Sequence, residues 1–269
     1  MERIQSALAK ARAAREGKAT PGGKPTVQAA AQAQAWAEIA ELPLDAGLLT
    51  RNRIIAHASV PEAATFDVMR TNLLRQMRSN GWTRVAVTSP TAGCGKTTVL
   101  LNLAFSLARL ADVKVLVIEL DLRRPSIGRV LGGKGGLDFA SVLSGARPPA
   151  SQLRRWGPNL AFGCTSSPLA SPAELLSAPR TADIIDALEE RLRPDIILFD
   201  TTPMLVSDDT IAFLDQVDCA LMIAAAEETT ASDIEHCGKE LAKYTQVLGV
   251  VLNRCRFNDA TQDYGMSYS

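Results

Sequence analysis

The amino-acid sequence predicts an α/β fold in which helices cover both faces of a parallel sheet. Short apolar runs rich in valine, isoleucine and leucine alternate along the chain with longer segments of helical periodicity. These runs lack the polar–apolar alternation of a half-exposed strand, which indicates that both faces of each strand are buried. The chain of 269 residues, 46% of them hydrophobic, is long enough for one large domain or two small ones.

The first part of the expected fold contains two helices that each precede a strand. Helical spacing of apolar residues predicts a helix over residues 66–77, and the run RVAVT at 84–88 predicts a strand. An almost continuously apolar segment predicts a buried helix over residues 97–108. The run VKVLVI at 113–118 predicts the next strand.

The second part continues the alternation. A helix is expected over residues 182–193, followed by the strand DIILF at 195–199. The runs CALMIA at 219–224 and VLGVVL at 247–252 predict two more strands around a helix at 230–244. Apolar strands separated by helices in this way are typical of a parallel sheet.

The two ends of the chain lack this pattern. Residues 1–17 carry apolar residues at helical spacing among arginines and lysines, which predicts a short basic amphipathic helix. The stretch after it is rich in Gly, Pro, Ala and Gln and predicts a flexible linker. We therefore expect an N-terminal helix and linker over residues 1–50, a folded domain over 51–257 and a flexible tail over 258–269.

Charge and composition exclude several classes of protein. The 29 Lys and Arg residues balance 29 Asp and Glu residues, which argues against nucleic acid or a lipid surface as the main partner. No run of 18 apolar residues occurs, so no transmembrane segment is expected. The N-terminus lacks the apolar stretch of a secretory signal, so a cytoplasmic location is expected. The cysteines are scattered without a C-x-x-C pair, which argues against a zinc site or a disulfide framework.

A loop of small residues joins the strand at 84–88 to the helix at 97–108. Its sequence, SPTAGCGKTT at 89–98, favours phosphate binding, because small residues let backbone N–H groups converge on an anion at the positive end of a helix. Lys96 would reach the β- and γ-phosphates of a nucleotide, and Thr97 would hold Mg²⁺. The residues expected to contact the nucleotide are Gly93, Cys94, Gly95, Lys96, Thr97 and Thr98. Pro90 stands where the usual pattern has its first glycine.

Carboxylates follow two of the expected strands. Glu119 and Asp121 come directly after the strand at 113–118, and Asp200 follows the strand at 195–199. Ligands of open parallel sheets lie outside the carboxyl ends of the strands, so these acids and the loop are expected to converge. They are candidates to hold the metal of a Mg²⁺–nucleotide site.

The sequence resembles the bacterial tyrosine kinases of capsule and exopolysaccharide synthesis over residues 60–257. The stretches that carry the resemblance are MRTNLL at 69–74, SPTAGCGKTT at 89–98, DLRRP at 121–125, SPAELLSAPR at 171–180, ILFDTTP at 197–203 and VVLNR at 250–254. The resemblance implies a P-loop NTPase fold like that of the partitioning ATPases. It also implies an ATP- and Mg²⁺-dependent tyrosine autokinase that regulates polysaccharide synthesis and export.

The resemblance also implies roles for individual residues. In this family, acids at the positions of Glu119, Asp121 and Asp200 arrange magnesium and assist attack by the tyrosyl hydroxyl. Asp121 is the candidate that would accept the hydroxyl proton. Asn253, at the end of the last expected strand, would either meet the adenine or cap a turn.

Partners and substrates follow from the same resemblance. Family members of this kind act with a membrane polysaccharide co-polymerase, a chain-length regulator, which would hold the chain at the inner face of the cell membrane. Self-association is expected, and Tyr264 and Tyr268 near the C-terminus are the candidate autophosphorylation sites. Arg123 and Arg124 would stabilise charge, join a neighbouring copy or remain a solvated pair.

Two features depart from the family pattern. Glu119 stands where Asp is usual, which keeps the charge but lengthens the side chain by one methylene. The family's oligomerisation motif, a Glu and two Arg at three-residue spacing, keeps only Arg70, with Ala64 and Asp67 at the other positions. This difference argues against the formation of an oligomeric ring through the helix expected over residues 66–77.

Two alternatives stay open from the sequence. One is a nucleotide-driven ATPase switch like the partitioning and septum-positioning ATPases, although their loop carries a second lysine at the position of Thr91. The other is a nucleotide-binding regulatory subunit that catalyses nothing. Phosphate release and phosphotyrosine formation distinguish the three: a kinase gives both, a switch only the first, and a regulatory subunit neither.

Overall fold

The computed structural model describes residues 27–133 and 135–255. The chain divides into two compact units, residues 1–34 and residues 35–269, and helix α2 (Val27–Ala37) crosses the boundary between them. Within the described ranges, each helix is too short or too polar to span a membrane. The predicted helix at 1–17 and the predicted tail, with Tyr264 and Tyr268, lie outside the described residues.

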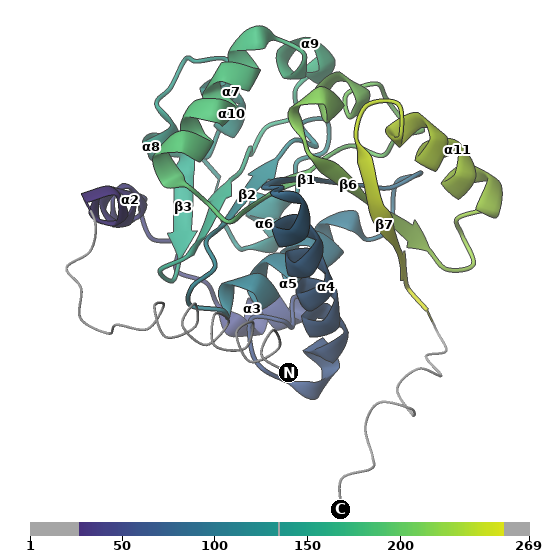
Figure 1. Cartoon of the computed structure of the whole chain (residues 1–269), viewed down its shortest axis with the longest axis horizontal. Helices are drawn as coiled ribbons and strands as arrows, with labels where there is room; N and C mark the ends of the chain where they lie inside the picture. Colours follow the sequence, from purple (N-terminus) through teal and green to yellow (C-terminus); the bar gives the residue numbers. More distant parts are fainter. Residues whose placement is uncertain (1–26, 134, 256–269) are drawn as a thin grey trace, which may run out of the picture. The chain divides into compact units, whose positions relative to one another are not determined.

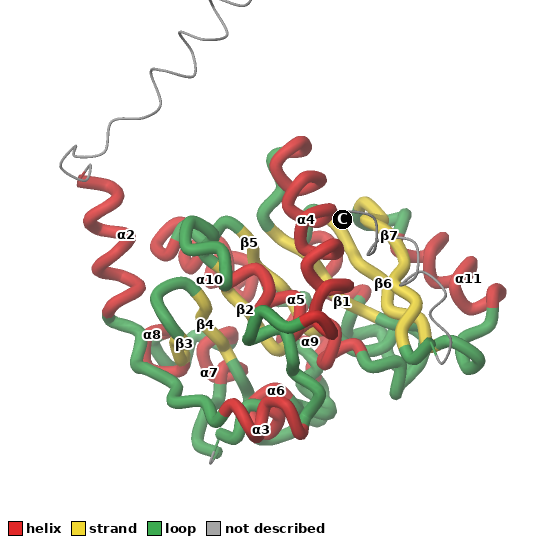
Figure 2. The backbone as a smooth tube through the Cα atoms, turned by 90° about the horizontal axis from the view of Figure 1, so that it is seen from below, coloured by secondary structure: helices red, strands yellow, loops and turns green. Residues whose placement is uncertain are grey.

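Among the described residues, seven strands form one sheet in the order β3-β4-β2-β5-β1-β6-β7 (Figures 1 and 2). Neighbouring strands run parallel, except that β3 and β4 are antiparallel. The strands are β1 (Arg84–Thr88), β2 (Val115–Glu119), β3 (Leu153–Trp156), β4 (Leu160–Gly163), β5 (Ile196–Asp200), β6 (Cys219–Ala225) and β7 (Gln246–Asn253).

One face of the sheet is covered by α4 (Ala64–Asn80) and α5 (Lys96–Ala108), with short helices α3 (Ala46–Arg51) and α6 (Ile127–Val130) beside them (Figure 1). Helix α5 is buried along nearly its whole length, and Leu103 and Phe105 are fully enclosed. Burial of one such side chain contributes about 1.5–3 kcal/mol to folding. The apolar sequence of α5 is therefore explained by a position between the sheet and α4.

The opposite face is covered by α10 (Pro179–Leu192), α11 (Ala231–Leu241) and α7 (Phe139–Leu143) (Figure 1). Helix α10 buries a stripe that includes Ile185 and Leu188, while its other face is polar. Helix α11 begins at a capping box in which Thr230 and Asp233 satisfy each other's backbone N–H groups. The remaining short helices are η1 (Pro61–Ala63), α8 (Pro149–Gln152), α9 (Pro172–Leu176) and η2 (Ile211–Gln216).

The expected α/β fold, with helices on both faces of the sheet, is confirmed, and every helix and strand predicted between residues 66 and 252 is present with shifts of a few residues at its ends. The expectation of a purely parallel sheet is wrong at one edge, where β3 and β4 form a hairpin that the sequence analysis missed. Two arginines in β3, LRRW, remove the continuous apolar run that marks the other strands. Both arginines are only half-buried at this edge of the sheet, where residues 40–42 pair with the outer side of β3 through hydrogen bonds from Arg155 N–H to the Ala40 carbonyl and from Leu42 N–H to the Arg155 carbonyl.

The segment from 35 to 50 differs from the linker predicted for it. Trp36, Ile39 and Leu49 are buried in the second unit, and the Trp36 indole Nε1 donates to the Leu192 carbonyl at 2.8 Å. The Lys114 ammonium lies over the Trp36 ring, 4.7 Å from its centroid. The predicted boundary at residue 50 therefore excludes residues that belong to the core.

Replacing Trp36 by alanine is expected to lower the free energy of unfolding by about 3–5 kcal/mol, because it removes a fully buried aromatic side chain and leaves a cavity. Urea unfolding of the purified chain measures this change. Trp82, which is only partly buried, provides the matched control: its replacement should cost less. Equal losses in the two variants would contradict the assignment of Trp36 to the core.

Candidate functional site

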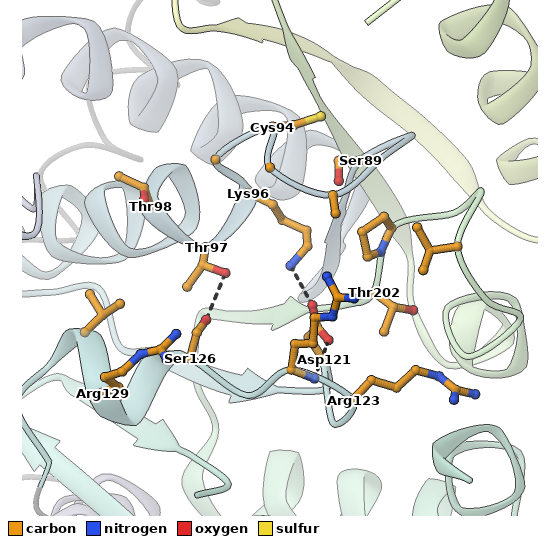
Figure 3. Close-up of a pocket in the computed structure, with 17 residues that line it drawn as sticks. Ser89, Cys94, Lys96, Thr97, Thr98, Asp121, Arg123, Ser126, Arg129 and Thr202 are labelled. Carbon is orange, nitrogen blue, oxygen red and sulfur yellow. Dashed lines mark hydrogen bonds and ion pairs between the residues drawn. The ribbon is translucent and has the colours of Figure 1, made fainter. Parts of the chain in front are cut away.

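The carboxyl ends of β1, β2 and β5 border a cavity of about 470 Å³ (Figure 3). The strand register brings the acids together there, because Asp200 of β5 lies opposite both Glu119 of β2 and Val87 of β1. The cavity is lined by the phosphate-binding loop, residues 89–98, by residues after β2 and by residues after β5. The sequence prediction that these three segments converge agrees with this arrangement.

The phosphate-binding loop depends on its glycines. Gly93 and Gly95 have φ angles of +87° and +84°, which glycine adopts without the strain of a side chain. A Cβ on Gly95 would also lie 2.3 Å from the Asn253 amide nitrogen, so no larger residue fits there. Proline has no backbone N–H, but its carbonyl can still accept a hydrogen bond. The Pro90 carbonyl does so here, from the Leu205 N–H at 3.0 Å.

The first residues of α5 point their side chains at Asp200. Lys96 Nζ lies 2.6 Å from Asp200 Oδ1, and the Thr97 hydroxyl donates to Asp200 Oδ2 at 2.7 Å. The Asp200 side chain is fully buried, and that of Lys96 nearly so. A buried carboxylate needs such partners, and the lysine is thereby held at the positive end of a helix, where phosphate would bind.

Asp121 stands beside this pair and lines the cavity. Its Oδ2 lies 3.6 Å from Lys96 Nζ, and its Oδ1 accepts from the Arg124 backbone N–H at 3.1 Å (Figure 3). Burial raises the pKa of Asp121 above its ordinary value, with Lys96 acting in the opposite direction and Asp200 adding repulsion. Asp121 is therefore a partly enclosed carboxylate that faces the cavity with an increased proton affinity.

Glu119 lies differently from the prediction, which made it a metal ligand and catalytic acid. Its side chain is fully buried and does not line the cavity. One oxygen accepts from the backbone N–H groups of Ser126 at 2.5 Å and Ile127 at 2.7 Å, and the other accepts from Thr165 N–H at 3.0 Å. The longer side chain of glutamate thus fastens two loops to the end of β2. Glu119 does not face the cavity because both of its oxygens accept hydrogen bonds from these loops.

Burial raises the pKa of Glu119 from 4.5 to about 7, although the backbone N–H donors oppose the change and Asp200 adds repulsion. The folded chain therefore keeps this proton up to near pH 7, whereas the unfolded chain loses it near pH 4.5. The contribution of the Glu119 proton to the free energy of unfolding is fully present below pH 4.5 and is lost as the pH rises to about 7. It amounts to roughly 3 kcal/mol.

We expect Glu119→Gln to remove most of this pH dependence, because glutamine does not titrate. Urea unfolding at pH 5 and pH 8 should show a decline in stability in the unmodified chain that is larger than in the variant by roughly 2–3 kcal/mol. Glu62→Gln, at an exposed position, is the control and should retain the full decline. The same decline in Glu119→Gln as in the unmodified chain would contradict the burial effect.

Asn253 and Cys94 connect the phosphate-binding loop to the end of β7. The Asn253 amide donates to the Cys94 carbonyl at 2.8 Å, and the side chain of Asn253 is not part of the cavity lining. The Asn253 side chain thus fastens the phosphate-binding loop to the end of β7, a contact that the sequence analysis did not predict. Burial would raise the pKa of the Cys94 thiol, but hydrogen bonds with Thr91 and Thr229 outweigh it and lower the pKa.

The arrangement fits Mg²⁺ bound together with a nucleotide. Among the described residues, no group of three or more His, Cys, Asp or Glu side chains is placed to hold a metal ion without other ligands. The Thr97 hydroxyl lines the cavity and supplies a hard oxygen ligand, which suits Mg²⁺ completed by water and phosphate oxygens. The predicted ligand Asp200 is fully buried and does not line the cavity, and its two oxygens are paired with Lys96 and with the Thr97 hydroxyl, so it would position that hydroxyl. Of the predicted phosphate-contacting residues, Gly93, Cys94, Gly95, Lys96, Thr97 and Thr98 all line the cavity.

A family model of the CobQ/CobB/MinD/ParA nucleotide binding domain matches residues 85–267. The match begins in β1 and includes the phosphate-binding loop and the three strand-end acids. The chain belongs to this CobQ/CobB/MinD/ParA family. The family is named for nucleotide binding, and the cavity described above is the candidate nucleotide site of this chain.

Relatives within this family carry the resemblance predicted from the sequence. EpsB of Ralstonia nicotianae, named for tyrosine-protein kinase activity, is 30% identical over 210 residues, which are 77% of this chain and 28% of EpsB. The tyrosine-protein kinase CpsD of Streptococcus pneumoniae serotype 4 is 28% identical over 70% of this chain and 82% of its own length. The solved VpsO kinase domain is 28% identical, with a TM-score of 0.64 over 72% of this chain and 97% of that domain.

These relatives confirm the resemblance to the bacterial tyrosine kinases. The chain spans less than a third of the length of EpsB and most of the length of CpsD.

An ion pair beside the cavity was not predicted. Both Arg123 nitrogens Nε and Nη2 donate to the carboxylate of Asp209, at 2.6 and 3.0 Å, and Asp209 is fully buried. Ser207 donates to the same carboxylate at 2.9 Å. The motif DLRRP pointed to Arg123, but nothing in the sequence indicates a partner so distant along the chain. Arg123 therefore connects the loops after β2 and β5 and is not the solvated residue considered above.

Arg70 is the residue of the family's oligomerisation motif that this chain keeps, and the structure shows its contacts within the chain. Its guanidinium donates to Asp67 at 3.2 Å and to the Ser106 carbonyl at 3.1 Å. Asp67 also accepts from Arg109 and from the Ser106 hydroxyl. These contacts fasten α4 to α5, so Arg70 and Asp67 have a role in the packing of this family member.

Proposed function

We propose that this chain is an ATP- and Mg²⁺-dependent protein-tyrosine kinase that phosphorylates its own C-terminal tail. The observation that carries the proposal is the position of Asp121, a carboxylate that lines the cavity 3.6 Å from Lys96 Nζ. A carboxylate beside the phosphate-binding lysine is placed to accept a proton from a hydroxyl nucleophile. The names of the relatives EpsB and CpsD support a tyrosine as that nucleophile.

In the proposed reaction, the tyrosyl oxygen attacks the γ-phosphorus of ATP. The new O–P bond forms as the bond between the γ-phosphorus and the β–γ bridging oxygen breaks, and ADP leaves. The phenolic proton passes to Asp121 and then to solvent. Lys96 and the N-terminus of α5 stabilise the charge on the phosphate oxygens. Mg²⁺, held at the Thr97 hydroxyl that Asp200 positions, would supply further neutralisation of that charge.

The test mixes two forms of the full chain with Mg²⁺ and labelled ATP. One form carries Lys96→Ala and keeps its tyrosines, and the other is active but carries Tyr264→Phe and Tyr268→Phe. Label on the Lys96→Ala chain, located by mass spectrometry on Tyr264 or Tyr268, is the expected result and shows transfer between copies.

Other results distinguish the alternatives. Release of phosphate with no phosphotyrosine would replace the kinase by a nucleotide-driven switch. No phosphate release and no phosphotyrosine, in the presence of ADP binding, would favour a regulatory subunit. In either case the proposed phosphoryl transfer to tyrosine fails.

We further propose that the chain regulates exopolysaccharide or capsular polysaccharide synthesis as a peripheral protein at the inner face of the cell membrane, bound to a membrane polysaccharide co-polymerase. Fractionation should find the chain with membranes only when such a partner is co-expressed. Equal recovery in membranes without the partner would contradict attachment through it.

A further inference from the structure

An apolar wall stands beside Asp121 on the side formed by the loop after β5. Pro203 and Val206 line the cavity, and Val206 and its neighbour Leu205 are two adjacent exposed apolar residues, with exposed fractions of 54% and 43%. The wall is held in place by backbone hydrogen bonds to the phosphate-binding loop, from Met204 N–H to the Ser89 carbonyl and from Leu205 N–H to the Pro90 carbonyl. The nucleotide phosphates do not need an apolar surface here, whereas an aromatic acceptor does.

The two neighbouring arginines of this rim differ in their contacts. Arg123 is bound to the buried Asp209. Arg124 is exposed, lines the cavity, and makes no side-chain hydrogen bond or ion pair with the described residues. Its backbone N–H donates to Asp121, and its side chain lines the same cavity as this proposed proton acceptor. Arg124 is thus a positive charge placed at the acceptor side of the cavity.

The tyrosines of the chain differ in the residue that precedes them. Tyr264 follows Asp263, Tyr268 follows Ser267, and Tyr244 follows Lys243. A positive rim therefore favours the first, is neutral toward the second and disfavours the third.

We propose that Arg124, Pro203 and Val206 form an acceptor subsite that selects Tyr264 of a second copy, with its ring against Val206 and with Asp263 paired to Arg124. This inference rests on the proposed kinase activity and adds its peptide specificity: an acidic residue directly before the tyrosine. Arg124 here is a specificity residue for the acceptor and does not act on the phosphates.

The experiment measures initial rates of labelling at Tyr264 and Tyr268 of a Lys96→Ala acceptor chain by a donor chain with Tyr264→Phe and Tyr268→Phe. With both partners otherwise unmodified, we expect Tyr264 to be labelled several-fold faster than Tyr268. An acceptor with Asp263→Lys should lose about fivefold at Tyr264, the upper range for a single exposed ion pair. An acceptor with Ser267→Asp should gain at Tyr268.

Charge exchange locates the donor residue. Arg124→Glu in the donor should lower labelling of the unmodified acceptor at Tyr264 and restore labelling of the Asp263→Lys acceptor, because the pair is re-formed with opposite signs. Val206→Ser should raise the KM for the acceptor and leave the KM for ATP unchanged. The control is Arg129→Glu: Arg129 also lines the cavity but points toward Ser126 and Thr97 (Figure 3), so it should leave the ratio of Tyr264 to Tyr268 unchanged.

The outcomes separate the two proposals. Labelling that proceeds with the same ratio of Tyr264 to Tyr268 in the Asp263→Lys acceptor and in the Arg124→Glu donor would overturn the acceptor subsite and leave the kinase activity standing. Absence of label from both tyrosines with the unmodified donor, and from a synthetic copolymer of Glu and Tyr, would overturn the kinase activity itself.

Discussion

Replacing Lys96 by alanine is expected to lower kcat/KM for phosphoryl transfer by about 10²–10³-fold, because a preorganised positive charge on the phosphates is lost. Affinity for MgADP should fall as well, since a charged hydrogen bond contributes about 1.5–3 kcal/mol. The structure adds a second effect. Lys96 neutralises the fully buried Asp200, and removal of one partner from a buried pair costs about 3–5 kcal/mol of stability. Isothermal titration with MgADP and urea unfolding measure the two effects.

The double variant Lys96→Ala with Asp200→Asn separates these effects. Asparagine has no charge to neutralise and can still accept from the Thr97 hydroxyl, so stability should largely return. Nucleotide affinity and activity should remain low. Unchanged MgADP affinity in a folded Lys96→Ala chain would show that the loop does not bind phosphate through this lysine.

Replacing Asp121 by asparagine is expected to lower kcat by about 10²–10⁴-fold, the usual contribution of a general base. Asparagine keeps the acceptor for the Arg124 N–H, so the loop should stay in place and MgADP affinity should change much less than kcat. A general base acts only when it is ionised, and burial raises the pKa of Asp121. As the pH is lowered, the activity of the unmodified chain should therefore begin to fall at a higher pH than it would with an ordinary aspartate. That decline should be absent from the residual activity of the variant.

Asp208→Asn is the matched control, since Asp208 is an exposed aspartate near the same loop and outside the cavity lining. It should leave kcat and its pH profile unchanged. Full activity in Asp121→Asn would show that this carboxylate has only a structural role and that another group accepts the proton.

Those parts of the fold that depend on local sequence could be predicted. The central strands β1, β2, β5 and β6 are apolar along nearly their whole length because both of their faces are covered. Strands β3 and β4 have four residues each and are recognisable only through their pairing with each other. The burial of Trp36 depends on α10 and on Lys114, which the sequence around position 36 does not indicate.

The candidate site divides in the same way. Lys96 and Thr97 were predictable because one loop and one helix end determine where they lie. Glu119 was not, because its hydrogen-bond donors come from two loops that are brought together only by the folded sheet. The pairing of Arg123 with Asp209 likewise joins two loops that are distant in sequence.

The position of β5 has a consequence for the synthesis of the chain. This strand fills the gap between β1 and β2, yet it begins only at Ile196, after both neighbours and the β3–β4 hairpin have been made. A ribosome adds about 5–20 residues each second. For several seconds, therefore, the nascent chain carries two apolar strands whose shared neighbour does not yet exist. Unpaired strand edges of this kind are where aggregation begins. Chaperone binding during translation is therefore expected to be strongest after β2 emerges and to end once β5 has been added.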